Sequence, residues 1–198
     1  MSGLYALVLA AGKGARFGGR KLLSPWRGGA LLDGALAVAL AAPVEAVVLV
    51  TGSDADEVAA AGRDFAARRG RNERLTVVTA HDFAEGLSAS LRAGLAALPG
   101  DAAGVLVFLG DMPVVPPDIA PKLACALADG ASAAAPVHKG RRGHPVAFSR
   151  MLFPDLAALT GDKGARGLLD RLGDGMALIQ TESDGVLIDV DRPGQAPA

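Results

Sequence analysis

Short apolar runs alternate along the chain with longer segments in which apolar residues recur every three or four positions. The first run, residues 5–10 (YALVLA), ends abruptly at glycine, which is typical of a strand buried on both faces of a parallel sheet. The same pattern predicts further strands that alternate with helices. Strands are expected at 44–52, 74–80, 104–111 and 132–137, and helices at 31–42, 54–70, 88–100 and 116–130.

The alternation is less regular beyond residue 143. Strands are expected there at 144–149, 176–181 and 185–190, and helices at 151–159 and 165–173. Strands that alternate with helices favour a three-layer, Rossmann-like α/β fold with a mostly parallel, twisted sheet. Ligands in such folds bind outside the carboxyl ends of the strands, so we expect the chemistry to lie in the loops that follow the strands.

The composition fits a single domain that spans residues 1–198. Apolar residues make up 51% of the chain and aromatic residues only 4%, so the core must be built mainly from Ala, Leu and Val. The 20 basic residues are balanced by 21 acidic ones. Because no overall positive field exists, nucleic acid and anionic membranes are not expected as partners, and any anion site must be local.

One cysteine, Cys125, excludes an internal disulfide and suggests a reducing compartment. It falls within a predicted helix, where we expect it to be buried as a small hydrophobic residue. No apolar stretch approaches the roughly 20 residues of a membrane span, and the first residues lack a signal-peptide pattern. We therefore expect a cytoplasmic protein that does not associate with membranes.

The loop after the first strand, within residues 7–23 (LVLAAGKGARFGGRKLL), is rich in glycine and in cations. Its glycines permit positive φ angles, so successive N–H groups can form a nest for an anion. Arg16 offers a bidentate guanidinium and Lys21 a point charge, both suited to phosphate. The loop matches neither the GxGxxG dinucleotide fingerprint nor the P-loop string, and a solvated surface loop is the alternative interpretation.

Carboxylates follow two other predicted strands. Asp111 comes directly after the apolar run 105–109, and Asp189 and Asp191 lie at the end of the last predicted strand. Mg²⁺ typically takes one or two carboxylates together with substrate phosphates. Each aspartate taken alone is as well explained by a turn or a solvated surface, but together with a phosphate-holding loop they favour a metal-assisted phosphoryl site.

Six motifs in order resemble the MobA-like nucleotidyltransferases, which attach a nucleotide to molybdopterin during molybdenum-cofactor maturation. Residues 9–23 resemble the family signature L-[AG]-[AG]-G-x-[SG]-x-R-[FM]-G-x-x-K, although Gly14 stands where many members have serine. Five further segments resemble the EGxxxSLxxG, metal-aspartate, GxPVxF, GDxGAR and DIDTPED motifs. They are FAEGLSASLRAGL (83–95), LGDMP (109–113), GHPVAFS (143–149), GDKGARGLL (161–169) and DVDRP (189–193).

The resemblance implies an NTP donor bound by the N-terminal half, an acceptor bound by the C-terminal half, and Mg²⁺. The Leu9-to-Gly12 version of the first motif is similar to the CTP-using branch, while guanylyl relatives tend to carry LAGG. The nucleotide would contact Leu9, Ala10, Ala11, Gly12, Gly14, Arg16, Lys21, Ser88 and Asp111. Arg16 and Lys21 would hold its phosphates; Asp111 would be the principal metal ligand and Asp189 the second, with Asp191 as the alternative.

Three residues are expected on the acceptor side, namely His144, Lys163 and Arg166. A structural imidazole beside Pro145 and a plain loop-to-helix start are the alternatives for these positions. Ser88 or Ser90 either caps the predicted helix or contacts the nucleotide. The three histidines have no metal-ligand spacing, so zinc is not expected.

The sequence therefore predicts transfer of a nucleotide, CMP before GMP, from an NTP to a phosphorylated acceptor such as molybdopterin, with release of pyrophosphate. A molybdoenzyme or its chaperone is the expected protein partner. A sugar or polyol phosphate is the alternative acceptor. Two further alternatives are a nicotinamide-dependent oxidoreductase, with Asp54 as ribose ligand, and a module that binds a nucleotide cofactor without turnover.

Overall fold

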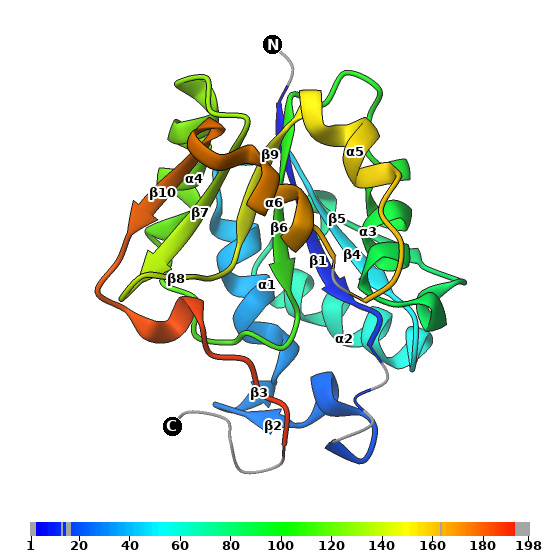
Figure 1. The fold of residues 1–198 in the computed structure, drawn as a ribbon. Coiled ribbons are helices and arrows are strands. Elements are labelled where there is room, and N and C mark those ends of the chain that lie inside the picture. Colours follow the sequence, from blue (N-terminus) through cyan, green and yellow to red (C-terminus); the bar gives the residue numbers. More distant parts are fainter. Residues whose placement is uncertain (1–2, 13, 15–16, 163, 193–198) are drawn as a thin grey trace.

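The computed structural model describes residues 3–12, 14, 17–162 and 164–192 (Figure 1). In this part of the chain an eight-stranded sheet has the order β10-β7-β9-β6-β1-β4-β5, with β8 paired to β7. Its strands are β1 (Leu4–Ala10), β4 (Val47–Thr51), β5 (Leu75–Thr79), β6 (Gly104–Leu109), β7 (Ala133–His138), β8 (Arg141–Arg142), β9 (Val146–Ser149) and β10 (Met176–Gln180).

The sheet is mostly parallel, as predicted. β1 runs parallel to β4 and β6, β4 to β5, and β7 to β10. β9 is inserted between β6 and β7 and runs antiparallel to both, which the apolar pattern of residues 144–149 does not reveal. The carboxyl ends of β1, β6 and β7 therefore lie at one edge, where the candidate loops converge.

Helices cover both faces of the sheet and complete the expected three layers (Figure 1). The first face packs against α1 (Leu32–Ala41), α2 (Ala55–Arg68) and α4 (Ile119–Ala128). The second packs against α3 (Leu87–Ala96), α5 (Phe153–Ala157) and α6 (Arg166–Leu172). None of the described helices is long and apolar enough to cross a membrane.

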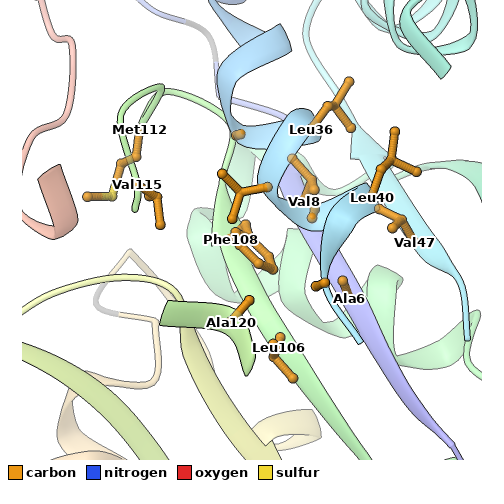
Figure 2. Packing of buried hydrophobic residues seen from close by; sticks show 14 of the residues in the cluster. Ala6, Val8, Leu36, Leu40, Val47, Leu106, Phe108, Met112, Val115 and Ala120 are labelled. Atoms are coloured by element: carbon orange, nitrogen blue, oxygen red, sulfur yellow. The ribbon is translucent and has the colours of Figure 1, made fainter. Parts of the chain in front are cut away.

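The core between the sheet and α1 is built from aliphatic side chains around one aromatic ring. Figure 2 shows Leu36 and Leu40 of α1 near Val8 and Phe108 of the two central strands, and all four side chains are buried. Burial of such a side chain contributes roughly 1.5–3 kcal/mol each. Gly34 on the same helix lets the backbone approach closely, because an added Cβ would lie 2.3 Å from the Pro113 carbonyl oxygen.

The predicted strand at 185–190 is wrong. A 3-10 helix, η7 (Asp184–Val186), stands at its start, and the following residues cross the carboxyl edge of the sheet without joining it. The backbone groups of this segment form hydrogen bonds with loops instead of with a neighbouring strand. His144 N–H donates to the Val186 carbonyl (2.9 Å), and Val190 N–H donates to the Asp111 carbonyl (3.0 Å).

Cys125 is exposed, so the expectation that it is buried is also wrong. It lies on α4, whose buried positions Leu123 and Ala124 face the sheet, whereas Cys125 borders a shallow groove beside β10. The small elements after the glycine-rich loop were not predicted either. They are η2 (Lys21–Leu23) and a hairpin of β2 (Pro25–Trp26) and β3 (Gly29–Ala30).

Replacement of Gly34 by alanine is expected to lower the free energy of unfolding by roughly 1–3 kcal/mol, because the new methyl group would overlap the Pro113 backbone. Gly167 provides the matched control, since it is also helical and an added Cβ meets nothing within 4 Å. Gly167→Ala should raise the free energy of unfolding by up to about 1 kcal/mol. Urea denaturation measures both; equal effects of the two substitutions would contradict the packing described for α1.

Candidate active site

The glycine-rich loop turns sharply after β1 and delivers Lys21 back to the sheet edge. Gly14 has φ +55°, and its carbonyl accepts hydrogen bonds from Phe17 N–H (2.8 Å) and Gly19 N–H (3.2 Å). A Cβ on residue 14 would lie 2.9 Å from Cβ of Lys21, so glycine at this position gives Lys21 its room. Lys21 then begins η2, with its side chain only 12% exposed.

Lys21 binds two carboxylates that come from distant parts of the chain. Its Nζ lies 2.7 Å from Asp111 Oδ2 and 3.4 Å from Asp191 Oδ1. Asp111 directly follows Gly110, whose N–H donates to the Leu9 carbonyl (2.9 Å) and so holds the end of β6 beside the end of β1. The Val190 N–H bond to the Asp111 carbonyl fixes the segment that carries Asp191.

Asp189 is placed differently from Asp191. Its side chain is exposed, and no ion pair with Lys21 is found for it in the described residues. Its negative charge, like that of Asp111, nevertheless acts to raise the pKa of His144. The structure therefore brings Asp191, rather than Asp189, to the same cation as Asp111.

A cavity of about 600 Å³, the glycine-loop cavity, opens beside this cluster. Among the predicted nucleotide residues, it is lined by Leu9, Ala11, Gly12, Gly14, Lys21 and Asp111. Ala10 and Ser88 are buried and are not among its lining residues. Phe83 and Asp162 also line it and were not predicted. Ser90 and Asp191 line it as well and had been expected only as alternatives.

A second cavity of about 550 Å³ adjoins the first and shares Leu9, Leu87 and Leu109 with it. We call it the arginine-rimmed cavity, because Arg141, Arg142 and Arg166 line it. His144 and Arg166, both predicted on the acceptor side, line it. No carboxylate is found among its described lining residues. Its remaining wall is largely apolar and includes Val107, Val146, Phe148 and Leu169.

Two further cations at the rim, Arg141 and Arg142, were not predicted. They form the short strand β8, which follows a tight turn in which Lys139 and Gly140 both have positive φ. Arg142 is ion-paired with Asp170 of α6, whereas Arg141 is exposed. The sequence signal was the string HKGRRGH (138–144), in which two arginines directly follow a Lys-Gly turn.

The segments 85–88 and 161–164 meet at the start of α3, between the two cavities. Ser88 N–H donates to the Gly161 carbonyl (3.2 Å), and the φ of Gly86 is +111°, with a Cβ there only 2.2 Å from Asp162 Oδ1. Gly86 is the N-cap residue of α3 and no side chain caps this helix, so the capping role weighed for Ser88 or Ser90 is wrong. The Ser88 hydroxyl is fully buried and has no hydrogen-bond partner in the described structure.

His144 lies in the wall of the arginine-rimmed cavity. Burial lowers its pKa below the usual value, and a backbone hydrogen bond with Val107 and the charges of Asp111 and Asp189 oppose this shift. Its Nδ1 is buried with no partner among the described residues. A neutral imidazole is therefore favoured at this position, and its contact with an acceptor stays a prediction. The predicted residues Arg16 and Lys163 lie outside the described residues.

Comparison with known proteins identifies the family. The model of the MobA-like NTP transferase domain matches residues 6–176. The chain belongs to the MobA-like NTP transferase family. Molybdenum cofactor cytidylyltransferase of Escherichia coli is 28% identical over 193 residues, which cover 98% of this chain and 93% of that protein. Nicotine blue oxidoreductase of Paenarthrobacter nicotinovorans is 32% identical over 202 residues, which cover 96% and 92%.

Two solved structures superpose closely on the chain. Rv0371c from Mycobacterium tuberculosis has a TM-score of 0.82 at 29% identity, covering 98% of this chain and 95% of that one. A nucleotidyl transferase from Methanothermobacter thermautotrophicus has a TM-score of 0.77 at 26% identity, covering 98% and 94%. The MobA-like family and the Rossmann-like fold expected from the sequence are thereby confirmed.

The buried imidazole of His144 should make folding stability depend on pH. The folded-state pKa lies below the unfolded value of about 6.5, so between these two values the unfolded chain binds more protons than the folded one. The free energy of unfolding should therefore fall as the pH drops below that unfolded value and level off below the folded pKa. Denaturation midpoints over this range should lose this component in His144→Asn and keep it in His81→Asn, which alters an exposed histidine; equal profiles would contradict the assignment.

Proposed function

We propose that the protein transfers a nucleotide from an NTP to a phosphorylated acceptor and releases pyrophosphate. One observation carries this proposal. A single ammonium, that of Lys21, lies between two carboxylates in the wall of one cavity, and that cavity adjoins a second one with an arginine rim. The first suits a metal-bound triphosphate and the second an anionic acceptor, so the two reactants would meet at the shared residues Leu9, Leu87 and Leu109.

The donor set fits Mg²⁺. Asp111 and Asp191 both contact one ammonium, so their oxygens lie within reach of a common cation. The glycine-loop cavity has three carboxylates and one ammonium among its described lining residues, and an entering triphosphate needs a cation to offset this charge. Mg²⁺ commonly takes one or two carboxylates together with substrate phosphate oxygens, so two aspartates suffice for such a site.

A solved relative supports a divalent ion. The structure of Rv0371c from M. tuberculosis in complex with manganese has a TM-score of 0.70 at 28% identity, covering 91% of this chain and 89% of that one. A bound cation would neutralise triphosphate charge during transfer. Asp111 and Asp191 would hold it; for Asp189, the second ligand expected from the resemblance, no ion pair with Lys21 is found in the described residues.

The residues of the chain would then act by position and charge. The Lys21 ammonium would bind the triphosphate, and the backbone of Gly12 and Gly14 would line it. An oxygen of the acceptor phosphate attacks the α-phosphorus and forms a new P–O bond. The bond between the α-phosphorus and the bridging oxygen breaks, and pyrophosphate leaves. Arg16, by the resemblance, would neutralise the leaving charge. No general base is needed, because a phosphate monoester is already anionic near neutral pH.

CTP is the proposed donor and molybdopterin the proposed acceptor. The Leu9-to-Gly12 sequence resembles the cytidylyl branch, and the E. coli relative is named for that activity. The acceptor cavity offers an apolar wall and a cationic rim, and the carboxylates that commonly bind sugar hydroxyls are missing from its described lining. This favours a ring system that carries a phosphate over a sugar or polyol phosphate. A molybdoenzyme or its chaperone would receive the product.

Pyrophosphate release tests the proposal. Each of the four common NTPs is incubated with Mg²⁺ and with molybdopterin, a sugar phosphate or a polyol phosphate. We expect release above background only with CTP and molybdopterin. In parallel, CTP with Mg²⁺ should raise the melting temperature, since a ligand at 100 times its Kd stabilises by about 2.7 kcal/mol. Stabilisation by GTP alone would identify GTP, the guanylyl alternative, as the donor. If no pair of NTP and acceptor released pyrophosphate, the proposal would be wrong.

Oxidoreduction is the second candidate, because the P. nicotinovorans relative is named as an oxidoreductase. Asp54, the ribose ligand that this alternative requires, stands at the N-cap of α2 with φ +52° and lines neither cavity. Binding of NADH or NADPH, followed by fluorescence, separates the candidates. A nucleotide cofactor retained through purification without any pyrophosphate release would instead favour the non-catalytic binding module.

The two aspartates of the C-terminal segment should differ in effect. Asp191→Asn is expected to lower kcat at least tenfold and to raise the Mg²⁺ concentration that gives half-maximal rate. The reason is that Asp191 and Asp111 both contact the Lys21 ammonium and are therefore placed to bind one metal ion. Asp189→Asn should change both quantities less than threefold. Asp111→Asn, the positive control, should abolish turnover. Equal effects of the Asp189 and Asp191 variants would contradict this assignment of the second ligand.

Arg141 should govern the affinity for the acceptor. Its guanidinium stands at the rim with no ion pair to a described residue, so it is available to a phosphate. Arg141→Ala is expected to raise KM for the acceptor about tenfold while KM for CTP stays unchanged. Arg63→Ala, an exposed arginine of α2 on the opposite face of the sheet, is the control. An increase in KM for CTP instead of the acceptor would reverse the assignment of the two cavities.

A further inference from the structure

The outer edge of β10 is open. In the described part of the chain β10 pairs with β7 and with no other strand, and it forms one margin of the sheet (Figure 1). Gly175 C=O accepts from Ser132 N–H (3.3 Å) and Thr181 N–H donates to Val137 C=O (3.0 Å), so the odd-numbered residues direct their backbone groups toward β7. The N–H and C=O groups of Met176, Leu178 and Gln180 therefore face outward.

This edge has none of the usual protection against pairing. The strand MALIQ contains no charge and no proline, both of which commonly block an exposed edge. Leu178, at its centre, is 50% exposed and is one of two large hydrophobic residues exposed in the described structure; the other is Met151. The opposite margin, β5, exposes no large hydrophobic residue. An uncharged edge centred on an exposed leucine is suited to another strand.

A shallow groove runs between this edge and α4. It has a volume of about 480 Å³ and is lined by Pro121, Lys122, Cys125, Ala126 and Asp129 of the helix side and by Leu178, Ile179 and Gln180 of the strand. Since α4 joins two parallel strands of one sheet, it runs antiparallel to β10. Lys122 therefore lies toward the Gln180 end of the edge and Asp129 toward the Met176 end, about 10 Å apart along the helix.

We propose that this face binds a second copy of the chain about a twofold axis at Leu178. Antiparallel pairing of the two β10 strands would place Leu178 opposite Leu178 of the second copy as a hydrogen-bonded pair, and Met176 opposite Gln180. The outward backbone groups would then be paired, and the two exposed leucines would cover each other on one face of a continuous sheet.

The charges beside the groove support this choice of occupant. The same twofold axis reverses the order of charges on α4, so Lys122 of each copy faces Asp129 of the other. Lys122 also pairs with Asp118 within its own helix (2.6 Å), and both of these side chains are exposed. A groove with opposite charges at its two ends is complementary to itself, whereas a partner with uniform charge would be repelled at one end.

The mass of the protein in solution tests the proposal. Light scattering over a concentration series should give a mass twice that of the 19.9 kDa chain at the upper end. Leu178→Lys should shift the protein to the mass of one chain with an unchanged circular dichroism spectrum, because this side chain is half exposed. Met151→Lys, at the other exposed hydrophobic residue, should leave the dimer unchanged. A single-chain mass for the wild type throughout, or a dimer that survives Leu178→Lys, would overturn the proposal.

Two further variants test the same dimer through its charges if Leu178→Lys folds poorly. Asp129→Lys should weaken the dimer at least tenfold, and Asp129→Lys combined with Lys122→Glu should restore it, because each pair regains opposite charges. Cys125 is exposed in the groove, so a short bis-maleimide should link two wild-type chains and fewer chains of Asp129→Lys. No recovery in the double variant, together with equal crosslinking, would assign any dimer to another surface.

Discussion

The contact of Lys21 with Asp111 and Asp191 holds the candidate site together. The three residues are separated by 90 and 170 positions in the sequence and come from the glycine-rich loop, the end of β6 and the C-terminal segment. The ion pair is partly buried, so it is screened less by salt than a surface pair and holds three loops at one point. The sheet places the ends of β1 and β6 side by side, and the ammonium supplies the charge that keeps two nearby carboxylates compatible.

This arrangement explains why the cavities differ in chemistry although they share three leucines. Carboxylates gather on the side of the glycine-rich loop, and guanidinium groups gather on the side of β8 and α6. The division follows the fold: Asp111 is carried by the first parallel half of the sheet, whereas Arg141 and Arg142 follow β7, beyond the antiparallel strand β9. The fold thereby places an acidic wall and a wall with guanidinium groups next to each other.

Much of the fold could be predicted from the sequence, because each buried parallel strand is a continuous apolar run that ends in glycine or a polar residue. Asp111 and Lys21 were predicted to lie in one site, and the structure brings them into contact. The segment 185–190 was not predictable in this way. Val186 and Val190 are buried although neither belongs to a strand, and alternation alone cannot distinguish such burial from that of a strand.

For the same reason the sequence could not show that Asp191, rather than Asp189, contacts Lys21. Two residues two positions apart share a face only on an extended strand. The hydrogen bond from Val190 to the Asp111 carbonyl sets which carboxylate reaches Lys21, and that contact is invisible in a local pattern. Arg141 was missed because a pair of arginines beside a turn usually indicates no more than a solvated hairpin. The exposure of Cys125 depends on the position of α4 near the margin of the sheet, which only the strand order reveals.

The segment that carries Asp191 contributes to no strand, yet it completes the cluster around Lys21. A chain that ended before Val190 would still contain every strand of the sheet and the whole of both helical layers, but it would lack one of the two carboxylates and the hydrogen bond that orients the other's loop. The scaffold and this part of the site are therefore encoded by separate parts of the sequence. The residues that follow β10 can therefore alter the chemistry at the carboxyl edge while every strand keeps its neighbours.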